Sequence, residues 1–350
     1  MRKKVLAVLM AATMVVGMTA CGGKDEPAAT DAPDANASTD DNAGDNADSD
    51  AADADSDSSK TIKVGIINND PNESGYRTAN VNDLKAMFTA ENGYDAQFAY
   101  SLKNDEQISA AKQFIQDEVD YLLLSAAATT GWDETLQEAQ KAGVKVILFD
   151  RTIEADDSLY ESSVVSDMAE EGNKAVDWLK SQSLDSYSII HLKGEIGSAA
   201  QVGRSGALED AAKSEGWDIV LSTGCEWNEK KAQDAVQSVI DQKKDFNVIY
   251  AENDNMAKGA VAALDKAGIE HGVGKKVIVM GFDCNKWALQ ELLDKNWNYD
   301  GQCNPFQSEY LDEIIKKLEA GETVEKKIVM DEKGFDAETI TEDDVNTYGI

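Results

Sequence analysis

Short apolar runs rich in β-branched residues alternate with amphipathic stretches from Ile62 onward. The runs predict strands, and the stretches, with apolar residues three and four positions apart, predict helices. The predicted strands are 62–67, 95–100, 121–124, 144–149, 187–192, 219–222, 248–250 and 277–282. The predicted helices are 81–91, 106–116, 132–142, 169–180, 198–213, 229–241, 256–266 and 287–295. Repeated strand–helix units predict an α/β fold with parallel sheets covered by helices on both faces.

The pattern of strands and helices restarts after the strand at 144–149. Two successive series predict two similar Rossmann-like lobes, with the first crossing between them near 164–167. The stretch from Thr61 to Ile350 is long enough for two compact lobes with separate cores.

The N-terminus has the pattern of a secretory signal. Arg2-Lys3-Lys4 precede an apolar run at 5–17, and Met18-Thr19-Ala20-Cys21 follows. A basic segment, a short apolar segment and small residues before the cleavage point are typical of a signal peptide. The last four residues resemble the lipobox of bacterial lipoproteins, with Met18 in place of the usual Leu. The resemblance implies a signal peptide at 1–20, lipidation of Cys21, and an extracytoplasmic protein anchored to the cell membrane by lipid. The alternative is an ordinary signal peptide with an incidental cysteine.

The next segment, with Cys21 at its start, runs to residue 60 and is dominated by Asp, Ala, Asn, Ser and Thr. Such a composition buries too little apolar surface to offset its ordering entropy, so 21–60 is predicted to be a disordered acidic tether. A spacer that holds a domain off the membrane and a merely soluble filler both fit.

The net charge of the chain limits the classes of molecule that it can bind. The chain carries 66 Asp and Glu against 33 Lys and Arg, a formal net charge of −33. This argues against nucleic acid and against adhesion to anionic head groups. No apolar run after the first is long enough to span a bilayer.

Cysteine and histidine are too sparse for a metal site or a Ser-His-Asp hydrolase. Beyond Cys21, only Cys225, Cys284 and Cys303 remain, and their spacing matches no metal motif. One disulfide with a free thiol, or three buried thiols, are both open. His191 ends an apolar run and is interpreted as a structural residue. We expect no metal, no cofactor and no catalytic residue.

Ligands of open α/β sheets bind outside the carboxyl ends of the strands. There is no Gly-x-Gly-x-x-Gly loop after the first strand and no Walker A loop. Sugar sites use planar polar groups for hydroxyls and flat aromatic rings for C–H faces. The residues that fit are Arg151, Arg204, Asn253, Asp283, Gln302 and Trp227.

Four stretches resemble the ribose/galactose-type sugar-binding proteins of ABC importers, over nearly all of 61–350, with the galactofuranose-binding branch as the nearest pattern. They are Glu73-Ser74-Gly75-Tyr76-Arg77-Thr78-Ala79-Asn80, Ala128-Thr129-Thr130-Gly131-Trp132, Leu148-Phe149-Asp150-Arg151 and Tyr250-Ala251-Glu252-Asn253-Asp254-Asn255-Met256-Ala257. Asn68-Asn69-Asp70, Cys284 and Cys303 depart from that family's pattern.

The resemblance implies a type I periplasmic binding protein with three hinge crossings, near 164–167, 302–305 and 325–329. One lobe would comprise 61–165 and 304–327, and the other 166–303 and 328–350. The implied ligand contacts are Glu73, Tyr76, Arg77, Trp132, Asp150, Arg151, Arg204, Trp227, Asn253, Asp283 and Gln302. The implied partners are a monosaccharide, pentose or hexose and of either ring form, and the permease subunits of an ABC transporter. The protein is expected to be a monomer.

Each assignment has a structural alternative. Asp150 and Arg151 also fit an ion pair at a strand end, and Trp227 also fits a residue that caps the core. Trp132 fits both a pocket wall and helix packing. At the level of function, a sensor for a sugar-like signal and a glycosidase that uses Asp150 and Asp283 are the alternatives. Arg151 beside Asp150 disfavours the glycosidase, which needs one carboxyl in an apolar pocket.

Overall fold

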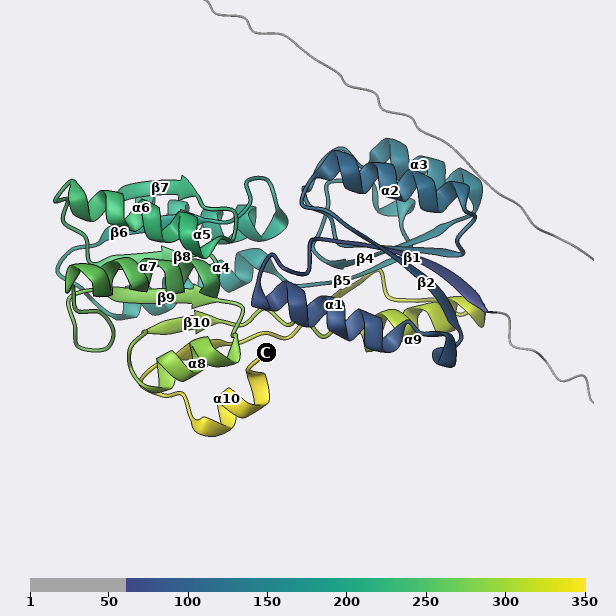
Figure 1. The fold of residues 1–350 in the computed structure, drawn as a ribbon. Helices are drawn as coiled ribbons and strands as arrows, with labels where there is room; N and C mark the ends of the chain where they lie inside the picture. Colours follow the sequence, from purple (N-terminus) through teal and green to yellow (C-terminus); the bar gives the residue numbers. More distant parts are fainter. Residues whose placement is uncertain (1–60) are drawn as a thin grey trace, which may run out of the picture. The chain divides into compact units, whose positions relative to one another are not determined.

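The computed structural model describes residues 61–350. The predicted signal peptide, the lipidated Cys21 and the tether at 21–60 lie outside the described residues. The described chain forms two lobes, each built on a sheet with helices on both faces (Figure 1). No helix among residues 61–350 is both long and apolar enough to cross a membrane.

The first lobe contains a sheet of six strands in the order β11-β5-β4-β3-β1-β2, all paired in parallel. Its strands are β1 (Ile62–Asn68), β2 (Tyr94–Tyr100), β3 (Tyr121–Leu124), β4 (Lys145–Asp150), β5 (Ser162–Val165) and β11 (Lys327–Val329). Its helices are α1 (Gly75–Met87), α2 (Asn104–Gln116), α3 (Asp133–Ala142) and α9 (Ser308–Glu319), with short 3-10 turns η1 (Ala90–Asn92) and η2 (Asp157–Leu159).

The second lobe repeats this plan with the order β12-β10-β9-β8-β6-β7, where only the β10–β12 pair is antiparallel. Its strands are β6 (Ser188–Lys193), β7 (Asp218–Gly224), β8 (Val248–Ala251), β9 (Ile278–Phe282), β10 (Tyr299–Gly301) and β12 (Gly334–Asp336). Its helices are α4 (Met168–Ser181), α5 (Ala199–Glu215), α6 (Glu229–Asp241), α7 (Asp254–Ala267), α8 (Lys286–Leu293) and α10 (Glu342–Tyr348).

Alternation along the strands divides each lobe's core in two. In β3, Tyr121 and Leu123 pack toward α1 and α9, whereas Leu122 and Leu124 pack toward α2 and α3. Successive strand side chains point to opposite faces, so a strand covered on both sides must be apolar throughout. The second lobe has the same division, with α4 and α5 on one face and α6, α7 and α8 on the other.

The chain crosses between the lobes at 166–167, 302–307 and 330–333. The predicted lobe boundary between 327 and 328 is wrong, because Ile328 and Val329 pair with Val164 and Val165 at the edge of the first sheet. The third crossing therefore follows Val329 and does not lie at 325–329.

The first helix also differs from its prediction at 81–91. It begins at Gly75, where the Ser74 side chain caps it by accepting a hydrogen bond from the Arg77 backbone N–H at 3.2 Å, and it ends at Met87. Its first two turns carry polar residues that point toward the interior, Arg77 and Asn80, so the apolar periodicity begins nearly two turns late.

Two glycines of α5 provide a matched test of close helix packing. A Cβ at Gly203 would lie 2.5 Å from the Met168 carbonyl carbon, whereas a Cβ at Gly206 would meet nothing within 4 Å. Gly203→Ala should therefore destabilise the protein by about 1–3 kcal/mol through overpacking. Gly206→Ala should stabilise it by about 0.5–1 kcal/mol, because alanine loses less entropy in a helix. Urea unfolding of both variants checks this, and changes of the same sign would contradict it.

Candidate functional site

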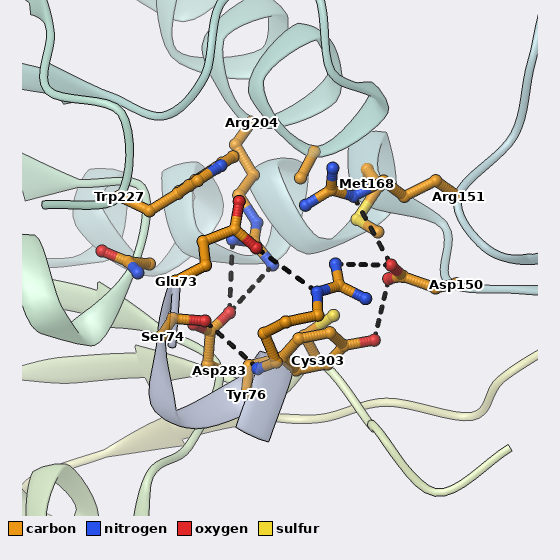
Figure 2. Close-up of a pocket in the computed structure, with 13 residues that line it drawn as sticks. Glu73, Ser74, Tyr76, Asp150, Arg151, Met168, Arg204, Trp227, Asp283 and Cys303 are labelled. Carbon is orange, nitrogen blue, oxygen red and sulfur yellow. Dashed lines mark hydrogen bonds and ion pairs between the residues drawn. The ribbon is translucent and has the colours of Figure 1, made fainter. Parts of the chain in front are cut away.

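A pocket of about 300 Å³ lies where the strand ends of both lobes meet (Figure 2). The first lobe contributes residues from the start of α1 and the end of β4. The second lobe contributes residues from the starts of α4, α5 and α7 and from the loops after β7 and β9. The lining residues are Glu73, Ser74, Tyr76, Arg77, Asp150, Arg151, Met168, Ala200, Arg204, Trp227, Asn253, Asp283 and Cys303.

Asp150 is the centre of the first-lobe half. Its Oδ1 accepts a hydrogen bond from the Tyr76 hydroxyl at 2.8 Å, and its Oδ2 accepts one from the Ser125 hydroxyl at 2.6 Å. Arg77 Nη2 lies 2.7 Å from Asp150 Oδ2, and Arg77 Nε lies 3.3 Å from Glu73 Oε2. Both carboxylate oxygens of Asp150 are thus occupied by protein groups.

Arg77 is held from behind by two buried asparagines. Its Nη1 donates to Asn68 Oδ1 at 2.7 Å and to Asn80 Oδ1 at 3.1 Å. Asn80 in turn donates to the Pro305 carbonyl in the second crossing at 2.8 Å. These bonds fix the guanidinium plane, so Arg77 acts as a rigid wall of the pocket.

Arg204 is the corresponding centre of the second-lobe half. Its Nε and Nη2 both lie 2.7 Å from Glu171 Oε2, and its Nη1 lies 3.5 Å from Asp283 Oδ1. The guanidinium carbon also stands 4.7 Å from the centre of the Phe282 ring, a cation–π contact. Glycine at 203 permits this geometry, because it lets α5 approach α4 closely enough for Arg204 to reach Glu171.

The two pocket aspartates are in opposite electrostatic settings. Burial opposes ionisation of Asp150, but Arg77 and Arg151 outweigh it and lower the pKa of Asp150 to about 2. Burial raises the pKa of Asp283 well above its usual value, and Arg204 only partly offsets this. Asp150 is therefore a fixed charge, whereas Asp283 is readily protonated.

Two buried donors face the pocket without a partner in the described protein. They are the indole Nε1 of Trp227 and the amide Nδ2 of Asn253. Asn253 uses its Oδ1 to cap α7 by accepting from the Met256 N–H at 2.9 Å, which leaves its NH₂ group unused. The Trp227 ring packs against Gly194, where a Cβ would lie 1.9 Å from the ring. Both donors are available to a bound molecule.

Three pocket residues have left-handed backbone conformations. The φ angles are 65° at Asp150, 61° at Trp227 and 107° at Asp283. Such conformations cost free energy in residues other than glycine and concentrate at functional sites. At the ends of β4, β7 and β9 they turn the side chains out of the strand direction.

Nine of the eleven predicted contacts line the pocket; Trp132 and Gln302 do not. Trp132 is fully buried in the core beside Leu136, with its Nε1 donating to the Ala128 carbonyl at 3.1 Å. Gln302 joins the second crossing to the third, because its Oε1 accepts from the Lys333 N–H at 3.2 Å.

The predictions missed four lining residues, Ser74, Met168, Ala200 and Cys303, and the supporting carboxylate Glu171. One signal in the sequence was available. Arginine occurs only at positions 2, 77, 151 and 204, and all three arginines of the described chain line this pocket.

The remaining candidate residues have structural settings. Cys225, Cys284 and Cys303 are buried free thiols, so the interpretation without a disulfide is the one observed. His191 is buried and lies 2.7 Å from Glu252 Oε1, with Ser205 and Ser222 also in contact, which agrees with its structural interpretation.

Comparison with known proteins agrees with this geometry. Residues 64–317 match the family model described as periplasmic binding protein domain. The chain belongs to the periplasmic binding protein family. Its two-lobed α/β fold is that of the type I members, as the sequence predicted.

Sugar-binding proteins of ABC importers are among the relatives of this periplasmic binding protein. The fructose import binding protein of Bifidobacterium longum is 29% identical over 97% of this chain and 96% of its own. The galactofuranose-binding protein of Escherichia coli is 27% identical over 74% and 82%. A crystal structure from Mycobacterium smegmatis in complex with β-D-fucofuranose has a TM-score of 0.73 and 31% identity, covering 79% and 92%.

The stability of the protein in acid should distinguish Asp150 from a carboxylate with an ordinary pKa. Its pKa of about 2 lies below the usual 3.8, so its ionisation stabilises the fold above pH 3.8 and this contribution is lost as pH falls through about 2. The contribution is about 2 kcal/mol. Asp150→Asn should destabilise the protein at neutral pH, because Arg77 stays buried without its partner. As the pH falls, this variant should lose less stability than the wild type. Urea unfolding over this pH range measures both effects; the exposed Asp95→Asn is the control, and parallel acid profiles would contradict the assignment.

Proposed function

We propose that this chain is the substrate-binding lipoprotein of an ABC importer, which captures a monosaccharide between its lobes and delivers it to a membrane permease. The observation that carries the proposal is the pocket itself. Charged planar groups from both lobes surround donors, on Trp227 and Asn253, that lack protein partners. A buried donor without a partner costs free energy, and sugar hydroxyls supply acceptors.

The charge of the pocket favours a neutral ligand. Three arginines line it, and three carboxylates pair with them: Glu73 and Asp150 contact Arg77, and Glu171 contacts Arg204. An anionic or cationic ligand would unbalance a buried set of charges, which is costly. A neutral polyhydroxyl compound gains charge-assisted hydrogen bonds without this cost.

We propose a sugar in its furanose form, and two relatives support this choice. The relative from M. smegmatis holds β-D-fucofuranose, and the arabinose-transporter protein of Shewanella sp. ANA-3, with 28% identity and a TM-score of 0.73, holds L-arabinofuranose. A pocket of about 300 Å³ is also at the small end of ligand sites.

The two lobes close around the sugar, and a lipid holds the protein at the membrane. We assign 61–165 with 304–329 to one lobe and 166–303 with 330–350 to the other. Contacts from both lobes mean that a bound sugar favours the closed arrangement, which the permease would recognise. Lipidation at Cys21 would hold this monomeric protein at the cell membrane.

Hydrolysis of the sugar is not part of the proposal. A glycosidase nucleophile needs a carboxylate oxygen that can reach the sugar. Tyr76 occupies one oxygen of Asp150, and Ser125 and Arg77 occupy the other. The sugar should therefore be recovered unchanged after binding.

Arg151 provides the direct test. Its contacts within the protein are long, 3.5 Å from Nε to Asp150 Oδ2 and 3.5 Å from Nη1 to the Ala126 carbonyl, so its guanidinium remains free for a ligand. Arg151→Ala should lose about 2–4 kcal/mol of binding free energy, on the order of 30- to 1,000-fold in affinity. Calorimetry with a panel of furanose and pyranose sugars measures this.

Lys112→Ala is the matched control, because it removes a half-buried cation of α2 outside the pocket. The control should bind as the wild type does. Failure of the wild type to bind any sugar would overturn the proposed function, and native affinity in Arg151→Ala would overturn the assignment of Arg151.

Trp227 should report binding by fluorescence. Trp227→Phe keeps a ring against Gly194 but removes the unpaired Nε1 donor, so it should weaken sugar binding and abolish most of the sugar-induced emission change. Trp132→Phe is the control, since Trp132 is equally buried but lies outside the pocket. A ligand response that persists in Trp227→Phe and disappears in Trp132→Phe would reverse the two assignments.

A further inference from the structure

The three hinge crossings meet at one buried carboxyl group. Glu332, in the third crossing, accepts at Oε1 a hydrogen bond from the Ser166 hydroxyl of the first crossing at 2.7 Å. The same oxygen accepts from the Asn304 backbone N–H of the second crossing at 2.6 Å. Cys303 Sγ lies 3.6 Å from the same hydroxyl. One side chain thus joins all three connections between the lobes.

Glu332 also faces a second buried carboxyl group, that of Glu171 on α4. Ligand-type atoms of Glu171, Cys303 and Glu332 lie within 4.8 Å of one another, and Glu171 and Glu332 are only 4% and 6% exposed. The other side of Glu171 binds Arg204, so Glu171 connects the hinge to an arginine of the ligand pocket.

Glu171 and Glu332 are neighbouring buried carboxyl groups, and only Glu171 contacts Arg204, so both cannot ionise cheaply. Burial, and after it the negative charge of the neighbouring Glu171, raises the pKa of Glu332 to about 9. Burial also raises the pKa of Glu171, but Arg204 opposes this, so Glu171 is the member that ionises first. The proton of the pair therefore belongs to Glu332.

Several other titratable groups surround the pair. The titratable or charged groups that face it from α4, α5, the second crossing and the loop after β9 are Lys174, Arg204, Cys303 and Asp283. Those around the adjoining cavity are Asp167, Glu170, Tyr299, Asp331 and Lys333. Lys174 donates to the backbone carbonyl of Glu332 and not to its carboxyl group. The adjoining cavity, about 560 Å³, is lined by both glutamates.

We propose that Glu332 is a protonated positioning residue, which donates a hydrogen bond to Glu171, thereby orients Arg204 in the ligand pocket, and fastens the three hinge crossings together. This inference rests on the proposed function only for its effect on sugar binding. Ionisation of Glu332 places two negative charges side by side in the hinge and loosens both the hinge and Arg204.

The direction of the pH effect follows from the raised pKa. The folded protein holds the proton more tightly than the unfolded chain, whose glutamate titrates near 4.5. The stabilisation is therefore complete below about pH 4.5 and declines as pH rises toward about 9.

Glu332→Gln tests the proposal, because the amide keeps the shape, the acceptor oxygen and a donor toward Glu171 but cannot ionise. Without sugar, the melting temperature of the wild type should fall over this pH range, and that of Glu332→Gln should fall clearly less. Glu332→Ala should melt lower than Glu332→Gln at every pH, since it loses the hydrogen bonds. The exposed Glu322→Gln is the control and should follow the wild type. Parallel profiles for the wild type and Glu332→Gln would overturn the proposal.

NMR titration of the side-chain carboxyl groups of the wild type tests the proposal even if the variants fold poorly. One glutamate should titrate far above the usual range, and the absence of such a group would overturn the proposal. With sugar, affinity should decline toward alkaline pH in the wild type and less so in Glu332→Gln. If the wild type binds no sugar, the proposed function fails, while the melting curves and NMR still decide the role of Glu332.

Discussion

Buried arginine is the constraint on which the rest of this structure depends. A guanidinium group removed from water must be paired with a carboxylate and must have its other donors satisfied. Arg77 meets this requirement with Asp150 and two asparagines, and Arg204 meets it with Glu171 and Asp283. Because the partners come from different strands and helices, each arginine fixes several elements of its lobe around one point.

These pairs separate the site into a rigid support and an open layer. Arg77 and Arg204 donate most of their hydrogen bonds to other protein groups, so they hold the shape of the pocket. Arg151, Trp227 and Asn253 keep donors that the protein does not use. A ligand that binds the open layer gains hydrogen bonds without disturbing the support, which is the arrangement that pre-organisation requires.

Periodicity in the sequence predicted the two lobes, the parallel sheets and the first crossing, because strands covered on both faces must be continuously apolar. It missed the first two turns of α1, where the polar residues Arg77 and Asn80 point inward and are held by partners from other parts of the chain. It also missed the edge strand at Lys327–Val329, which is too short to show a pattern.

Most of the pocket could be predicted, since strand ends and a family pattern locate Asp150, Arg151 and Asn253. Two errors have a common cause. Trp132 and Gln302 belong to residue types that suit a sugar site, but the direction of their side chains depends on tertiary packing. Trp132 packs into the core, and Gln302 binds the backbone of the third crossing. Glu171 was missed for the opposite reason: it stands in a helix among other acidic residues, and only the close approach of α5 brings Arg204 to it.

The hinge and the pocket are parts of one polar network. Asn80 links Arg77 to the second crossing, and Glu171 links Arg204 to the third. A change at a crossing therefore alters the partners of an arginine in the pocket. Because such coupling is reciprocal, any shift of Arg77 or Arg204 on ligand binding would act on the crossing in return. This coupling needs no conformational relay through the cores of the lobes, because the charged groups of the site are themselves bonded to the residues at which the lobes are joined.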